Sequence, residues 1–311
     1  MDDFIKFSAP EALSGIKRGV VALGVFDGVH RGHRKVVECA RATAEKHSAC
    51  AVALTFSPHP RLVLAGNDAV RLLMTESERL KCLRDCGADI TGIISFSREI
   101  AAWEPERFLD ELIGALPFEL KGICVGSNWR FGRYGSGNRD TLAAYCRLRD
   151  IDFVPVPEVE ERGITVSSSV IRQLIRDGEL AEVCKLAGRP PQLHGKVVPG
   201  MKVAGKELSA PTANLELACG ILPPDGVYAG SAELEGKFYP AVLNIGVAPT
   251  YNVTVRRIEI HFIGYSGNLY GRELTVSLEK FLRPIRRFSS PEELKAQIMA
   301  DIAEACGICQ R

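Results

Sequence analysis

The stretch of sequence that decides the fold is Gly24-Val25-Phe26-Asp27-Gly28-Val29-His30-Arg31-Gly32-His33. It follows an apolar run at 20–23 and precedes a helix-like stretch at 35–46, so we place it where a buried strand turns into a helix. The N–H groups and positive end of such a helix favour phosphate, and glycine lets the backbone approach a ligand closely. Imidazoles three positions apart can add donors. The stretch therefore indicates nucleotide phosphate chemistry; the alternative is a glycine-rich turn with two surface histidines.

The composition is that of an ordinary globular protein. A length of 311 residues favours two domains, and 46% hydrophobic with 25% charged residues is typical of a soluble chain. A net charge of +1 gives no basic footprint for nucleic acid. No apolar run is long enough to span a membrane, and Met1-Asp2-Asp3 is unlike a signal peptide. We expect a cytoplasmic protein without nucleic-acid or membrane partners, and a weak homo-oligomer stays open.

The cysteines do not predict a metal or redox centre. Ten of them are scattered without a pairing rhythm, as expected for small buried side chains in a cytosolic protein. Cys306-Gly-Ile-Cys309 has neither a second ligand pair nor a strand–helix context, so its role stays open. The H-x-x-H of the opening stretch likewise lacks nearby partners for a closed zinc site.

The first half of the chain alternates apolar strands with helical patterns. Such alternation predicts a parallel, doubly wound α/β sheet. The expected strands lie at 20–25, 51–56, 90–96, 122–125 and 152–156, and the expected helices at 33–46, 75–86, 105–113, 141–149 and 169–176.

The pattern changes near residue 188. Gly188-Arg-Pro-Pro191 is rich in turn formers, and the segments 227–234, 238–245, 256–263 and 273–281 then alternate with period two. Ser289-Ser-Pro-Glu-Glu293 caps a closing helix that runs to about residue 305. We predict a small antiparallel β-barrel with a C-terminal helix, and domains at 1–187 and 188–311.

Three further clusters accompany the opening stretch. Thr55-Phe-Ser-Pro-His59-Pro60 ends the second strand, on the same sheet edge as His30. Gly126-Ser-Asn128-Trp129-Arg130-Phe131-Gly132 offers an amide, an aromatic face and a guanidinium to a ring and its phosphates. Ser167-Ser168-Ser169-Val-Ile-Arg172 opens a helix, where its hydroxyls either cap the helix or bind phosphate.

In their order and spacing these four motifs resemble the bacterial bifunctional riboflavin kinase/FAD synthetase family, from about Val20 to Asp301. The resemblance implies that the first domain transfers an adenylyl group from ATP to FMN, giving FAD and pyrophosphate. Such a transfer needs positioning and charge stabilisation more than a covalent nucleophile, so His30 and His33 would act on the ATP phosphates. It further implies nucleotide or phosphate contacts at Gly24, Phe26, Asp27, Gly32, His59, Asn128, Ser168 and Arg172. For Asp27, a magnesium or substrate contact and a bracing role in the turn stay open.

The second half holds two candidate chemical motifs. In Pro211-Thr212-Ala213-Asn214, a hydroxyl and an amide carbonyl can reach one hard cation alongside ATP oxygens; a plain turn with a cap is the alternative. Alternation places Glu259 on the strand face opposite Ile258 and Ile260. There it is either a solvated carboxylate or a base for a hydroxyl proton. A Walker-like stretch at 200–206 is rejected, because Glu207 stands where that motif needs Ser or Thr.

This half resembles the riboflavin kinase module in its P-T-A-N, N-I-G-x-x-P-T, E-x-H and L-Y-G motifs and in the segment 282–288. The resemblance implies a six-stranded barrel that phosphorylates riboflavin, with Mg²⁺ and ATP on Thr212 and Asn214. It also implies Glu259 as the base, a nucleotide contact at Gly205 and a flavin or nucleotide contact at Arg283.

Three positions depart from the family pattern. Ser209 and Ala210 stand where the family has Gly and Phe, and Ala248 replaces a common arginine. A chain that only adenylylates FMN, with a weakened or merely flavin-binding barrel, is therefore the alternative. A non-catalytic flavin- or nucleotide-binding regulator is a further one. Because Thr212, Asn214 and Glu259 are present, we expect both activities.

Overall fold

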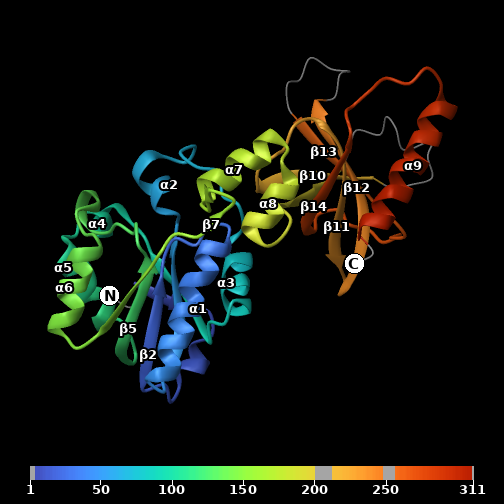
Figure 1. The fold of residues 1–311 in the computed structure, drawn as a ribbon. Helices are drawn as coiled ribbons and strands as arrows, with labels where there is room; N and C mark the ends of the chain where they lie inside the picture. Colours follow the sequence, from blue (N-terminus) through green and yellow to red (C-terminus); the bar gives the residue numbers. More distant parts are fainter. Residues whose placement is uncertain (1–3, 200–211, 248–255, 310–311) are drawn as a thin grey trace. The chain divides into compact units, whose positions relative to one another are not determined.

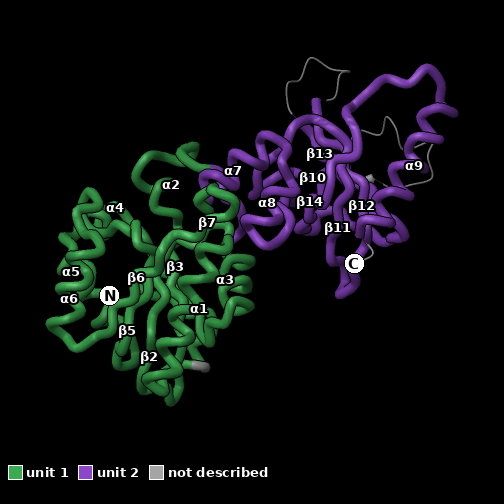
Figure 2. The backbone as a smooth tube through the Cα atoms, viewed as in Figure 1, with its two compact units in different colours: residues 1–70, 76–167 green, residues 71–75, 168–311 purple. Residues whose placement is uncertain are grey.

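The computed structural model describes residues 4–199, 212–247 and 256–309 (Figure 1). The chain divides into two compact units, residues 1–70 with 76–167 and residues 71–75 with 168–311 (Figure 2). Gly205, Ser209, Ala210 and Ala248 lie outside the described residues, and so do the predictions made for them.

The first unit contains the predicted parallel sheet. Its strand order is β1-β4-β3-β2-β5-β6, and all neighbours are parallel except β1 with β4. Apolar side chains such as Val21, Val52 and Ile123 are fully buried, which explains the continuous apolar runs. The strands are β1 (Ile5–Phe7), β2 (Arg18–Leu23), β3 (Cys50–Ser57), β4 (Ile90–Ser95), β5 (Glu119–Gly126) and β6 (Asp152–Val156).

The strand order places the opening motif at a switch point of the sheet. From β2 the chain adds β3 and β4 on one side, then β5 and β6 on the other. Ligands of open α/β sheets bind at the carboxyl ends of the strands where this reversal occurs. The residues that follow β2 and β5 therefore meet at the position expected for a nucleotide.

Helices cover both faces of this sheet, with α1 and α3 on one side and α5 and α6 on the other (Figure 1). The short helices α2 and α4, and a hairpin of β7 (Glu160–Glu161) and β8 (Ile164–Thr165), add to the predicted elements. The helices are α1 (Arg31–Lys46), α2 (Pro60–Ala65), α3 (Glu76–Asp85), α4 (Arg98–Ala101), α5 (Pro105–Gly114) and α6 (Arg139–Leu148).

The second unit is a closed antiparallel barrel of the order β10-β13-β12-β11-β14-β9, as the period-two pattern predicts. Alternate residues fill it, among them Leu215, Leu243 and Ile260, so the residues between them point outward. The strands are β9 (Gln192–Val198), β10 (Thr212–Cys219), β11 (Gly226–Leu234), β12 (Lys237–Val247), β13 (Arg256–Phe262) and β14 (Glu273–Arg283).

Three helices complete the second unit: α7 (Ser168–Asp177), α8 (Leu180–Ala187) and the closing helix α9 (Pro291–Cys309). The second compact unit therefore includes the chain from residue 168 onward, whereas the sequence pattern changes near residue 188. The domain boundary at 188 stays a prediction from the sequence. No helix within the described ranges is long and apolar enough to cross a membrane.

Candidate active sites

The two histidines of the opening motif form one rigid group at the start of α1. His30 is the N-cap, and its Nδ1 accepts a hydrogen bond from the backbone N–H of His33 at 3.4 Å. The two imidazoles stack with ring centroids 3.6 Å apart. A Cβ on Gly32 would lie 3.2 Å from the His30 ring, so glycine at this position leaves space for the imidazole.

The turn before α1 has an unusual backbone. Phe26 and Val29 have φ values of 53° and 32°, in the region that L-residues avoid. Strain of this kind persists only where the surroundings hold it and is frequent at functional sites. Phe26 is fully buried, its ring meets the edge of His33, and Gly24 leaves room for it. Asp27 is also buried, at 1% exposure.

The charges at the start of α1 are arranged for an anion. The first turn contains Arg31, His33 and Arg34 and no acidic residue. Cations at a helix N-terminus oppose the helix dipole, so this arrangement is unfavourable until an anion is bound. Arg31 is paired with Glu161 at 2.6 Å. The Nε of Arg34, in contrast, is buried without a hydrogen-bond partner among the described residues.

His59 and Asn128 lie at the same sheet edge, as predicted. His59 is the N-cap of α2, directly after β3, and is 8% exposed. Its Nδ1 accepts from the backbone N–H of Arg61 at 3.1 Å. Asn128 follows β5 and donates its side-chain N–H to Glu158 at 2.6 Å. Because β3 and β5 flank β2, both residues follow strands next to the one that leads into the His30 turn.

A pocket of about 670 Å³ opens in the first unit, partly lined by the predicted ring seat Trp129-Arg130-Phe131. Trp129 and Phe131 stack with ring centroids 4.6 Å apart. The described lining includes no carboxylate. Residues that sequence reasoning missed complete it: Phe56, Phe96, Arg98 and Arg133. Phe56 and Phe96 could have been predicted from the sequence, because each is an aromatic residue at the carboxyl end of a parallel strand. The pocket fits a flat aromatic ring with an anionic substituent.

Ser168 and Arg172 belong to the second compact unit, whereas His30 belongs to the first. Ser168 begins α7. Arg172 is 6% exposed, and its Nε donates to the backbone carbonyl of Arg71 at 2.8 Å. One donor of the Arg172 guanidinium is thus used in a hydrogen bond to the backbone. The contact of Arg172 with phosphate stays a prediction.

In the barrel, the strand register brings the predicted kinase residues together. Asn214 on β10 lies directly opposite Glu259 on β13, which lies opposite Asn244 on β12. Because Ile258 and Ile260 point inward, this row of side chains points out of the barrel. Asn244 was not predicted as a site residue, although the N-I-G motif to which it belongs was recognised in the sequence.

Two residues further along the ladder, Thr212 lies opposite His261. Thr212 is placed by its backbone only, and its side chain is not described. The Nδ1 of His261 is buried and has no hydrogen-bond partner in the described part of the chain. A ring nitrogen buried in this way needs a partner, either from the chain or from a ligand.

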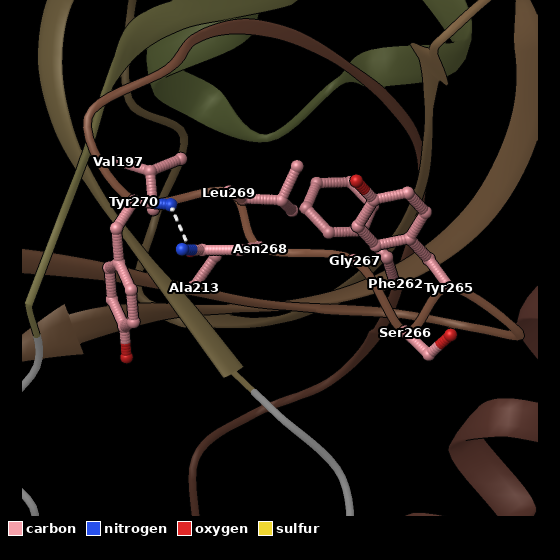
Figure 3. A pocket seen from close by; sticks show the side chains of 9 residues that line it. All are labelled: Val197, Ala213, Phe262, Tyr265, Ser266, Gly267, Asn268, Leu269 and Tyr270. Carbon is pink, nitrogen blue, oxygen red and sulfur yellow. Dashed lines mark hydrogen bonds between the residues drawn. The ribbon is translucent and has the colours of Figure 1, made fainter.

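A second pocket, of about 300 Å³, lies at the mouth of the barrel, where β9 and β13 end and β10 begins (Figure 3). Its walls are Val197, Ala213 and Phe262 together with the loop 265–270. The loop is held by a hydrogen bond from the Tyr270 N–H to the Asn268 side chain, at 3.0 Å. Ala213 belongs to the P-T-A-N motif and Tyr270 to the L-Y-G motif, so the pocket unites two motifs far apart in sequence.

Two positions whose roles were predicted or left open, Arg283 and Cys309, take part in contacts between α9 and the barrel. Arg283 forms an ion pair with Asp301 at 2.8 Å, and Asp301 is 4% exposed. The flavin contact of Arg283 stays a prediction. Cys309 donates to the carbonyl of Gly230 at 3.2 Å, and burial raises the pKa of its thiol to about 11. Among the described residues, no three His, Cys, Asp or Glu side chains could together hold a metal ion.

Comparison with known proteins identifies two family modules in the chain. The family model for FAD synthetase matches residues 14–170, and the model for riboflavin kinase matches residues 187–309. A bifunctional riboflavin kinase/FMN adenylyltransferase from Escherichia coli K12 is 34% identical over 91% of this chain and 90% of its own. This chain belongs to the bifunctional riboflavin kinase/FMN adenylyltransferase family.

A second family member, from Bacillus subtilis 168, is 32% identical over 93% of this chain and 92% of its own. A crystal structure described as a macrolide-efflux protein from Streptococcus pneumoniae shares the fold, with a TM-score of 0.81 and 30% identity. That match covers 94% of this chain and 96% of the other. The family's two modules thus both occur here.

Proposed function

We propose that this chain makes FAD from riboflavin in two ATP-dependent steps at two separate sites. The barrel phosphorylates riboflavin to FMN, and the parallel-sheet domain adenylylates FMN to FAD with release of pyrophosphate. The proposal rests on the presence of a suitable site in each unit. The first unit has a helix N-terminus that favours phosphate and an aromatic pocket. The second unit has the Glu259 carboxylate between two amides, Asn214 and Asn244, on the outer face of the barrel.

In the adenylyl transfer, the residues at the start of α1 act by position and charge. His30, His33 and the N–H groups of α1 bind the ATP phosphates and stabilise negative charge as an FMN phosphate oxygen attacks the α-phosphorus. Gly24 and Gly32 keep the space that Phe26 and His30 occupy, while the buried Asp27 braces the turn. The other predicted phosphate or nucleotide contacts are His59, Asn128, Ser168 and Arg172.

The flavin ring of FMN occupies the aromatic pocket beside Trp129 and Phe131. Stacking on aromatic faces suits the flat isoalloxazine ring, and arginines in the lining suit the electronegative atoms at its edge. An apolar pocket also excludes water from the ring.

In the phosphoryl transfer, Glu259 is the general base. Its carboxylate accepts the proton of the riboflavin 5′-hydroxyl while that oxygen attacks the γ-phosphorus of ATP and ADP leaves. Asn214 and Asn244 flank the carboxylate in register and orient the substrates by hydrogen bonds. The pocket at the barrel mouth, lined by Ala213 and Tyr270, takes the nucleotide base.

The residues present also fit a magnesium ion. A hard cation prefers oxygen ligands, and the P-T-A-N motif contains a hydroxyl-bearing residue, Thr212, and an amide, Asn214, which lies in register with the Glu259 carboxylate. When bound with ATP, the ion supplies charge neutralisation at the phosphates. The cytoplasmic location, the lack of nucleic-acid or membrane partners and the weak homo-oligomer stay predictions.

The test supplies purified protein with ATP and Mg²⁺, and with riboflavin in one reaction and FMN in another, and separates the flavins over time. We expect FMN and then FAD from riboflavin, and FAD from FMN. If FAD forms only from FMN, the chain is an FMN adenylyltransferase whose barrel does not phosphorylate riboflavin. If the folded protein converts neither flavin, the chain is a flavin- or nucleotide-binding regulator.

A further inference from the structure

Arg257 stands two residues before Glu259 on β13, on the same outward face of the barrel. It is half-buried, and in the part of the chain that the structure describes it makes neither a hydrogen bond nor an ion pair. Its neighbour Arg256 differs: that side chain is paired with Asp225 at 2.6 Å and also donates to the Pro223 carbonyl. Of the two consecutive arginines, only Arg257 has no partner of this kind.

The carboxylate near Arg257 is already used by another cation. The partner of Arg257 on β12 is Gly246, and Ile285 and Asp225 lie over that glycine, with the Asp225 carboxylate 3.5 Å from where a Cβ would stand. Asp225 is paired with Arg256 at 2.6 Å. On the other flank, the pairing of β10 with β13 ends at Asn214 opposite Glu259, one pleat short of Arg257. The guanidinium is therefore partly desolvated and forms no ion pair of its own among the described residues, which suits it to an anionic ligand.

The spacing suits a transferring phosphoryl group. Residues two apart on a strand are about 6.7 Å apart, and their side chains point the same way. That separation accommodates a phosphoryl group between a carboxylate that receives a proton and a guanidinium that binds oxygens. The same carboxylate would otherwise repel the phosphate, so a cation beside it has a clear electrostatic purpose.

We propose that Arg257 binds the γ-phosphoryl group of ATP in the riboflavin kinase site. In the step, the 5′ oxygen bonds to the γ-phosphorus and its proton passes to Glu259. The bond from the γ-phosphorus to the β,γ-bridging oxygen breaks, and ADP leaves. The guanidinium fork holds oxygens of the transferring group and offsets their charge. This role rests on the proposed kinase function, and it supplies a cation in a chain that has Ala248 where the family has an arginine.

The test compares Arg257→Gln with Lys196→Gln, the same charge change at an exposed position of β9 that lies in register with Glu216 and Glu273. We expect R257Q to lower kcat for riboflavin phosphorylation on the order of 100-fold, and K196Q to leave it unchanged. FMN adenylylation by the same sample is the internal control and stays at the wild-type rate.

A second measurement separates chemistry from folding. Arg257→Ala should regain part of its kinase rate when free guanidinium is added, because the lost group is then supplied in solution. A wild-type kinase rate in R257Q would overturn the proposal, and so would an R257A loss that guanidinium does not rescue. If the wild-type protein itself makes no FMN, the proposed kinase function fails rather than this assignment alone.

Discussion

The imidazole of His33 stacks on that of His30, with ring centroids 3.6 Å apart, while Nδ1 of His30 caps the helix that carries both. One nitrogen of His30 is thus used to begin α1, and the ring is held in place by that bond. The pair couples local helix stability to the position of a phosphate-binding group.

Replacing His30 separates these two roles. Asparagine is a good N-cap but has no imidazole, so His30→Asn should keep the melting temperature and lower FAD formation on the order of 100-fold. His30→Ala should lose stability as well, by about 1 kcal/mol. Thermal melts and the rate of FMN adenylylation measure the two effects. An unchanged adenylylation rate in H30N would contradict the role of the imidazole.

Gly32 should matter for a steric reason. A Cβ there would lie 3.2 Å from the His30 ring, so Gly32→Ala should shift the imidazole by a few tenths of an ångström and reduce FAD formation while riboflavin phosphorylation persists. The matched control is Gly114→Ala near the end of α5, where an added Cβ meets nothing within 4 Å. That change should leave both rates intact and stabilise the protein by up to about 1 kcal/mol. Equal FAD rates in the two variants would refute the argument.

The ion pair between Arg283 and Asp301 should anchor α9 to the barrel. Its side chains are only 17% and 5% exposed, so Asp301→Ala leaves a buried cation and should lower the free energy of unfolding by about 3 kcal/mol. Lys280 and Glu304 join the same two elements at the surface, and Glu304→Ala should cost no more than about 0.5 kcal/mol. Urea unfolding measures both; similar costs would show that burial of the pair does not matter.

Stability should fall at alkaline pH because of buried thiols. Burial raises the pKa of Cys309 to about 11, above its value in the unfolded chain. Between these two values the unfolded chain has lost a proton that the folded chain keeps, so stability decreases as pH rises from about 9 to 11. Below that window the contribution is fully present. Cys309→Ala should flatten this decline in urea unfolding, whereas Cys306→Ala should not.

Much of the first unit is predictable from sequence because buried parallel strands are continuous apolar runs with clear ends. The expected strand at 152–156 matches β6, and the helix at 33–46 begins two residues after the start of α1. The helices α2 and α4 were missed because six and four residues are too few to show a helical period. In the barrel, β9 was missed because Gly195 and Lys196 interrupt its apolar pattern.

The motifs of both sites could be predicted from the sequence, but which of their residues lie together in space could not. The sequence indicates Asn214 and Glu259 separately, but only the register of β10, β13 and β12 places them in one row with Asn244. Phe56 and Phe96 likewise come together with Trp129 through strand order, which no local pattern encodes. Register and strand order depend on long-range packing, and that is the part a single sequence leaves open.

The most direct test of two independent sites in one chain is a reciprocal pair of variants, Glu259→Gln and H30N, each given ATP with riboflavin or with FMN. We predict that E259Q makes FAD from FMN at the wild-type rate but almost no FMN from riboflavin. We predict the reverse for H30N, which should make FMN and almost no FAD. Riboflavin phosphorylation at the wild-type rate in E259Q would contradict the account, and so would the loss of both reactions in either folded variant.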